Sequence, residues 1–280
     1  MLPISPTRAG GLALALLSLL LAACIWAPGK FTSALDVRKD GRFSFSYTGE
    51  IHMLALSKMM NDMDSDAKKT FEPSACHKDD GIEERPCTRE EIATQKQEWQ
   101  EERARAADKR KRDAESMKAI LGGIDPSNPQ AAEEIAARLR RQAGWKSVTY
   151  KGDGLFDVDF AIAGRLDHDF AFPTIERFPM ANAFVQVTRR NDGTIRIDAP
   201  AFSPAATGEP FKGMMQGLNA KEGAPPFPQV DGRFTITTDG AVLANNTDEG
   251  PQADTAGQRL SWAVNARTPA APTALIRIAP

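Results

Sequence analysis

Three cysteines and three histidines are the side chains of this sequence best suited to nucleophilic, metal-binding or acid–base chemistry. His168 lies between two carboxylates in Asp167-His168-Asp169, and a histidine in that setting can act as a base or a metal ligand. The sequence contains no Gly-x-Ser-x-Gly nucleophile turn, no His-Glu-x-x-His zinc motif and no glycine-rich phosphate loop. We therefore interpret His168 as a surface residue of a polar turn. An envelope hydrolase or metal-dependent enzyme that uses His168 with nearby acidic residues is the alternative.

Cys24 directly follows an apolar run, residues 12–23, which is preceded by Arg8. A cationic residue before an apolar core of this length is typical of a secretory signal peptide, and the run is shorter than the ~20 residues of a membrane-spanning helix. The run ends Leu21-Ala22-Ala23-Cys24, which resembles the lipobox of bacterial lipoproteins. The resemblance implies that residues 1–23 are a lipoprotein signal peptide. It also implies that Cys24 carries a diacylglycerol on its sulfur and an acyl chain such as palmitate on its amine.

Several lipid chains hold a protein stably at a bilayer where a single chain does not. The sequence has no second apolar stretch of the length that a membrane-spanning helix needs. We therefore expect a protein of the bacterial cell envelope that is anchored to a membrane by its N-terminal lipid and faces the periplasm or the cell exterior. In a bacterium with two membranes, the lipobox resemblance implies that an Asp directly after the lipidated Cys would retain the protein at the inner membrane. Residue 25 is Ile, so the outer membrane is favoured.

Cys76 and Cys87 remain once Cys24 is lipidated. Export implies an oxidising compartment, where two remaining cysteines usually form a disulfide. Closing so short a loop stabilises the fold by about 2–3 kcal/mol. A zinc site from Cys76, His77 and Cys87 is the alternative, but a closed zinc site needs four ligands, usually in paired short spacings. We predict a Cys76–Cys87 disulfide that braces a polar surface loop, with no metal and no other cofactor.

Phe211, Met214, Met215 and Leu218 occur at helical spacing inside a stretch rich in Pro and Gly, residues 199–229. Because methionine adapts its shape to different partners, this segment is a candidate binding surface for an envelope protein or a lipid-like apolar ligand. The alternative is that the segment folds back on the body, since a loop this long inside a domain needs some packing.

The net charge of −2, from 35 basic and 37 acidic residues, argues against a nucleic-acid partner. The basic block at residues 109–112 is flanked by Asp108, Asp113 and Glu115. This favours a solvated, self-paired helix face over a site for anionic lipid headgroups. A hydrophobic content of 41% and a charged content of 26% are typical of globular proteins.

Alternating apolar residues predict a β-hairpin over residues 31–53, with its turn at Asp40-Gly41. From about Ser57 the periodicity is helical. A long charged helix over residues 88–121 begins at a capping box, because Thr88 and Glu91 can exchange hydrogen bonds with each other's backbone. A third helix is expected from near Asn128, with an apolar face and a stop at Gly144. That face consists of Ala132, Ile135, Leu139 and Ala143.

From Trp145 onward, apolar residues again occur at every second position, and Asp-Gly turns at 192–193 and 239–240 separate these alternating runs. This pattern indicates antiparallel β-structure. The predicted fold class is α+β, an antiparallel β-rich sheet or partial barrel with an inserted helical segment. The expected parts are the signal peptide at 1–23, the anchor and first hairpin at 24–56, a helical insertion with the disulfide loop at 57–144, and a β-rich body at 145–280. The alternative is two independent domains that meet near Gly144.

Three features together resemble a family of bacterial envelope lipoproteins, the LppM type. They are the lipobox at Cys24, the hairpin around Asp40-Gly41 and the β-rich stretch from Trp145 to Ile197. The resemblance implies an envelope location and no established enzymatic activity. We therefore expect a non-catalytic, lipid-anchored protein that binds a protein partner or an apolar ligand.

Overall fold

A computed structural model describes residues 26–53, 70–77, 83–120, 123–125, 128, 130–174, 183–203 and 229–278. The chain divides into two compact units. The first unit comprises Met1–Ser57 and Ala132–Pro280, and the second comprises Lys58–Ala131. The expected helical segment extended to residue 144, whereas the structure groups the helix α4 (Ala131–Arg140), from Ala132 on, with the strands.

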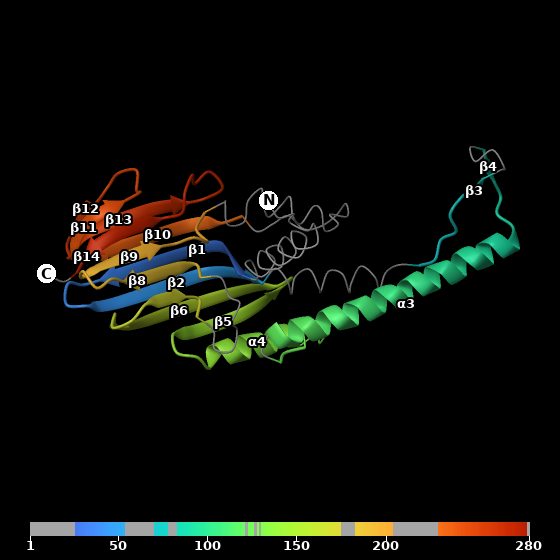
Figure 1. Cartoon of the computed structure of the whole chain (residues 1–280), viewed down its shortest axis with the longest axis horizontal. Helices are drawn as coiled ribbons and strands as arrows, with labels where there is room; N and C mark the ends of the chain where they lie inside the picture. The colour runs from blue at the N-terminus through green and yellow to red at the C-terminus, as the bar shows by residue number, and fades with distance from the viewer. Residues whose placement is uncertain are drawn as a thin grey trace, which may run out of the picture. The chain divides into compact units, whose positions relative to one another are not determined.

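The first unit contains a seven-stranded sheet in the order β12-β13-β10-β1-β2-β6-β5 (Figure 1). Its strands are β1 (Trp26–Val37), β2 (Arg42–Met53), β5 (Trp145–Gly152), β6 (Leu155–Arg165), β10 (Asp231–Thr238), β12 (Gln252–Asp254) and β13 (Gly257–Val264). The predicted hairpin is confirmed, because β1 and β2 are antiparallel neighbours joined through Asp40-Gly41. The other neighbours are also antiparallel, except β1 and β10, which run parallel with Lys30 opposite Asp231.

The same unit contains a five-stranded antiparallel sheet in the order β11-β14-β9-β8-β7. Its strands are β7 (Phe170–Phe172), β8 (Val185–Arg189), β9 (Thr194–Asp198), β11 (Ala241–Asn245) and β14 (Thr273–Arg277). Neither sheet closes into a barrel, and the α+β prediction is confirmed. The turn at Asp192-Gly193 joins paired strands as expected, but Asp239-Gly240 carries the chain from β10 in one sheet to β11 in the other. Alternation identifies the buried face of a strand and not its partner, so the sequence could not show this crossing.

Aromatic rings fill the space between the two sheets. Phe202, which follows β9, stacks on Phe31 of β1 at a centroid distance of 4.2 Å and meets Phe234 of β10 at 5.4 Å. Phe172 of β7 lies 5.0 Å from Tyr47 of β2. These side chains are almost completely buried, and each ring contributes a large apolar area to the core. The fold is therefore held by inter-sheet aromatic packing.

Helix α4 buries Ala132, Ile135 and Leu139, as its periodicity predicts. It ends at Arg140, so Ala143, expected on the same face, is exposed beyond the helix. Gly144 then adopts a φ of +90°, and a Cβ there would lie 2.5 Å from the ring of Phe160. Glycine is required at this position both by the left-handed backbone and by the close approach of the ring.

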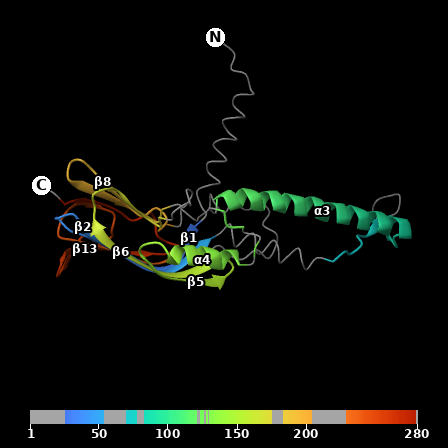
Figure 2. The ribbon, with the colours of Figure 1, turned by 90° about the horizontal axis from the view of Figure 1, so that it is seen from below.

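Among its described residues, the second unit contains the helix α3 (Arg89–Ile120) and a two-stranded ladder formed by β3 (Cys76–His77) and β4 (Glu84–Arg85). Figure 2 shows α3 from a second direction. The predicted long helix is confirmed, and its ends lie within one residue of the expected ones. In the part of the chain that the structure describes, no helix combines the length and the apolar character needed to cross a membrane.

Candidate functional site at the disulfide-braced start of α3

Cys76 and Cys87 form a disulfide, as predicted, with an S–S distance of 2.05 Å. Cys76 is buried in β3, and Cys87 lies two residues before the first residue of α3. The bond therefore ties the β3–β4 ladder to the start of the helix. We use the name "tip" for the segment 70–77 together with residues 83–99.

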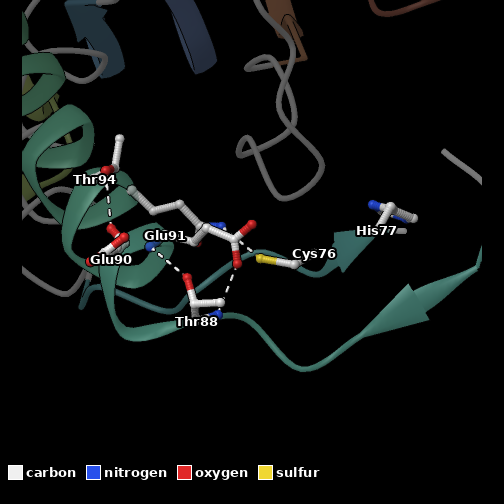
Figure 3. A pocket seen from close by; sticks show the side chains of 7 residues that line it. Cys76, His77, Thr88, Glu90, Glu91 and Thr94 are labelled. Atoms are coloured by element: carbon white, nitrogen blue, oxygen red, sulfur yellow. Dashed lines mark hydrogen bonds between the residues drawn. The ribbon is translucent and has the colours of Figure 1, made fainter. Parts of the chain in front are cut away.

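The capping box at the start of α3 is also confirmed (Figure 3). The backbone N–H of Glu91 donates to Thr88 Oγ1 at 3.2 Å, and the backbone N–H of Thr88 donates to Glu91 Oε2 at 2.8 Å. Arg85 of β4 donates to both carboxylate oxygens of Glu91, at 2.9 and 2.6 Å. The Arg85 hydrogen bonds, followed by those from Thr88, lower the pKa of Glu91 to about 2.

An open hollow lies between β3 and the first turns of the helix, as Figure 3 shows. It is lined by Cys76, His77, Thr88, Glu90, Glu91, Thr94 and Gln95. Gln95 fixes one wall, because its Oε1 accepts from the N–H of Ser74 at 2.9 Å and its Nε2 lies 3.6 Å from Cys76 Sγ. The imidazole of His77 lies apart from Cys76 and Glu91 in the same view. The hollow has hydrogen-bonding walls but its titratable groups do not converge on one point.

Among the described residues, the sulfurs of Cys76 and Cys87 and a carboxylate oxygen of Glu91 lie within 4.8 Å of one another. Thiolate sulfur is the form that binds metal, and these sulfurs are bonded to each other. Glu91 is also engaged by Arg85 through two hydrogen bonds. The cluster therefore has the chemistry of a structural brace.

An aromatic stack extends the tip along α3. Phe71 meets Trp99 edge to face at 5.8 Å, and the guanidinium of Arg103 lies 4.8 Å from the centre of the Trp99 ring. Of the charged block at 109–112, Lys109, Lys111 and Arg112 are exposed and Arg110 is half-buried. Most of the described α3 side chains are likewise exposed. The helix thus presents a highly charged surface whose first turns are held by local contacts.

Sequence reasoning missed Arg85, Gln95 and Phe71. Each reaches its partner across a bend between segments: Arg85 to Glu91, Gln95 to Ser74, and Phe71 to Trp99. Helix spacing rules connect positions three or four residues apart and do not cover such contacts. The Cys76–Cys87 pair was the one available signal that these segments lie together.

His168 is exposed in the turn between β6 and β7. The neighbouring Asp169 accepts a hydrogen bond from the backbone N–H of Arg189 at 2.8 Å and so fixes the turn. Among the described residues, His168 belongs to no group of three or more side chains that could hold a metal ion.

A second open hollow lies at the turn between β1 and β2. Arg38 forms an ion pair with Asp36 there and donates to the carbonyl of Ala256 at 2.6 Å. The N–H of Lys39 donates to Asp239 at 2.7 Å. These contacts join three turns of the first unit.

Cys24, the predicted lipidation site, lies outside the described residues, as do Phe211, Met214, Met215 and Leu218 of the candidate binding segment. The lipid anchor and the apolar binding segment therefore remain predictions from the sequence.

No protein-family model and no curated protein sequence match this chain. Among solved structures, the chain is similar to the folded domain of LppM from Mycobacterium tuberculosis, solved by NMR. The two share 11% sequence identity with a TM-score of 0.31, over 89% of this chain and 91% of that one. The resemblance is weak.

Proposed function

We propose that this chain is a non-catalytic, lipid-anchored lipoprotein of the bacterial cell envelope that binds a protein partner through α3 and the tip. The Cys76–Cys87 disulfide is the observation that carries the proposal, because such bonds persist in oxidising compartments and are rare in the cytosol. The apolar run before Leu21-Ala22-Ala23-Cys24 supplies the export route and the anchor.

The packing between the sheets supports a protein partner over an apolar ligand carried inside the body. A carrier needs a cavity between a sheet and its cover. Here Phe31, Phe202 and Phe234 stack through that space at centroid distances of 4.2 and 5.4 Å. Close-packed rings leave no room for a lipid chain at these positions.

The exposure of α3 supports its role as the partner surface. A helix that is polar on most sides gains little from burial and depends on local contacts. The disulfide, the Arg85–Glu91 ion pair and the Trp99 stack supply those contacts at its start. A surface that is already ordered loses little conformational entropy when it binds, which favours recognition.

Membrane fractionation tests the anchor. We expect the native chain to stay with membranes after a carbonate wash and the full-length Cys24→Ser variant to appear in the soluble fraction. Ser18→Ala, inside the apolar run, is the matched control and should stay with membranes. Retention, in the carbonate-washed membrane, of a Cys24→Ser chain that begins at residue 24 would contradict the lipid anchor.

Site-specific photo-crosslinking in cells tests the partner surface. A photoreactive residue at Gln100, exposed on α3, should give a crosslink to a defined envelope protein that mass spectrometry identifies. The same residue at Thr188, exposed on the inner strand β8, is the control and should give none. Crosslinks at Thr188 with none at Gln100 would place the partner surface elsewhere.

A further inference from the structure

The strand β11 forms one edge of the five-stranded sheet, and it carries neither the charges nor the very short length found at the other edges of the two large sheets. Figure 1 labels this strand. The edge strand β5 carries Lys146 and Lys151, and Arg140 donates to its Val148 carbonyl at 2.8 Å. The edge strands β7 and β12 are three residues long. Charges and short length are the usual means of blocking unwanted strand pairing. The five residues of β11, Ala-Val-Leu-Ala-Asn, include neither a charge nor a proline.

Leu243 at the centre of β11 is the exposed large hydrophobic side chain of the described residues, with 42% of its surface accessible. The register against β14 shifts between Val242 and Ala244, so Leu243 sits at a β-bulge. Leu243 is the extra residue of this bulge, and the register gives it no partner residue in β14.

Asn246 holds the end of this edge in place. Its Oδ1 accepts from Trp262 Nε1 at 3.0 Å and from the N–H of Thr273 at 2.8 Å, and its Nδ2 donates to the carbonyl of Ala271 at 2.8 Å. The strand is therefore ordered before anything binds to it, which lowers the entropic cost of docking.

We propose that β11 is a self-association edge at which two copies of this chain pair antiparallel, about a two-fold axis that passes close to Leu243. Such an axis places the exposed leucines of the two copies side by side at the centre of a self-complementary contact. The inference is independent of the proposed lipid anchor and partner.

The charges at the two ends of β11 favour a second copy in this orientation. At the Ala241 end, the backbone N–H of Lys39 donates to Asp239, and Arg277 is the strand partner of Ala241. Two exposed basic residues therefore accompany one acidic residue at this end. Asp248 and Glu249 follow the other end. Antiparallel pairing brings the basic end of each copy toward the acidic end of the other, whereas parallel pairing would bring like ends together.

The contact is small because only five residues of each copy pair, so we expect a weak dimer that forms at high concentration. Sedimentation velocity of the full-length Cys24→Ser chain, at concentrations from about 5 to about 500 μM, measures this self-association. The sedimentation coefficient should rise with concentration and fall back when salt is raised, since salt screens the charges at the strand ends. Leu243→Lys should abolish the rise, and Thr188→Lys, the same change on inner strand β8, should retain it.

Cysteine crosslinking locates the two-fold axis. In the Cys24→Ser chain, Leu243→Cys should give a covalent dimer with a short thiol-reactive crosslinker, and Thr188→Cys should remain monomeric. A sedimentation coefficient that does not depend on concentration would overturn the proposal. So would a Leu243→Lys variant that still associates, or a Leu243→Cys variant that crosslinks no better than Thr188→Cys.

Discussion

Replacing Phe202 with alanine removes one of the rings that pack between the two sheets. Phe202 is fully buried, and its ring lies 4.2 Å from Phe31, 5.4 Å from Phe234 and 6.3 Å from Phe184. A buried Phe→Ala change costs about 3–5 kcal/mol. Each aromatic pair adds about 0.5–1.5 kcal/mol beyond burial, so we expect Phe202→Ala to fall near the upper end of that range.

Urea unfolding, monitored by tryptophan fluorescence, measures this loss of stability. The urea concentration at the midpoint should fall, with little change in the m-value. Phe202→Leu keeps most of the volume but loses the ring contacts, so it should cost less than Phe202→Ala. The alanine variant should also bind benzene and gain thermal stability from it, because dry apolar cavities of this size accept such ligands. A loss below about 1 kcal/mol for Phe202→Ala, or benzene binding by the native chain, would refute the inference that rings fill the space between the sheets.

Three further predictions concern the tip and the core. Replacing both Cys76 and Cys87 by serine removes a disulfide between residues that are 11 apart in sequence. The loop-entropy model predicts that this lowers the free energy of unfolding by about 2.8 kcal/mol. Calorimetry should show a loss of stability that is confined to the second unit. The pKa of Glu91 is lowered to about 2 in the folded chain, from an ordinary value of 4.5. The stability that the ionised Glu91 contributes to the fold is therefore fully present above pH 4.5 and is lost as the pH falls toward 2. Helix content by circular dichroism should therefore decrease over that range, less steeply in Glu91→Gln. Tyr47→Phe leaves the Glu50 carbonyl without its 2.7 Å hydroxyl donor, for a loss of about 1 kcal/mol in urea unfolding.

Local patterns in the sequence predicted local structure well. The β1–β2 hairpin, the capping box at Thr88 and Glu91, the buried stripe of α4 and the Cys76–Cys87 bond all depend on residues close in sequence. Period, turn chemistry and cysteine count are sufficient for such features.

Long-range pairing could not be predicted in the same way. The parallel contact of β1 with β10 joins Lys30 to Asp231, and no spacing rule relates residues so distant. Alternation gives the same signal for two strands of one sheet and for strands of facing sheets, so the split of β10 and β11 between two sheets was not visible. At the tip, Arg85 and Gln95 depend on how two segments bend toward each other, which side-chain type alone does not specify.

Mass spectrometry of the N-terminal peptide, from protein purified out of bacterial membranes, tests most directly whether Cys24 is an anchor. The lipoprotein proposal predicts a peptide that begins at Cys24 and carries the mass of a diacylglycerol and an amide-linked acyl chain. A peptide that begins at Met1, or at Cys24 with a free thiol and a free amine, would contradict it.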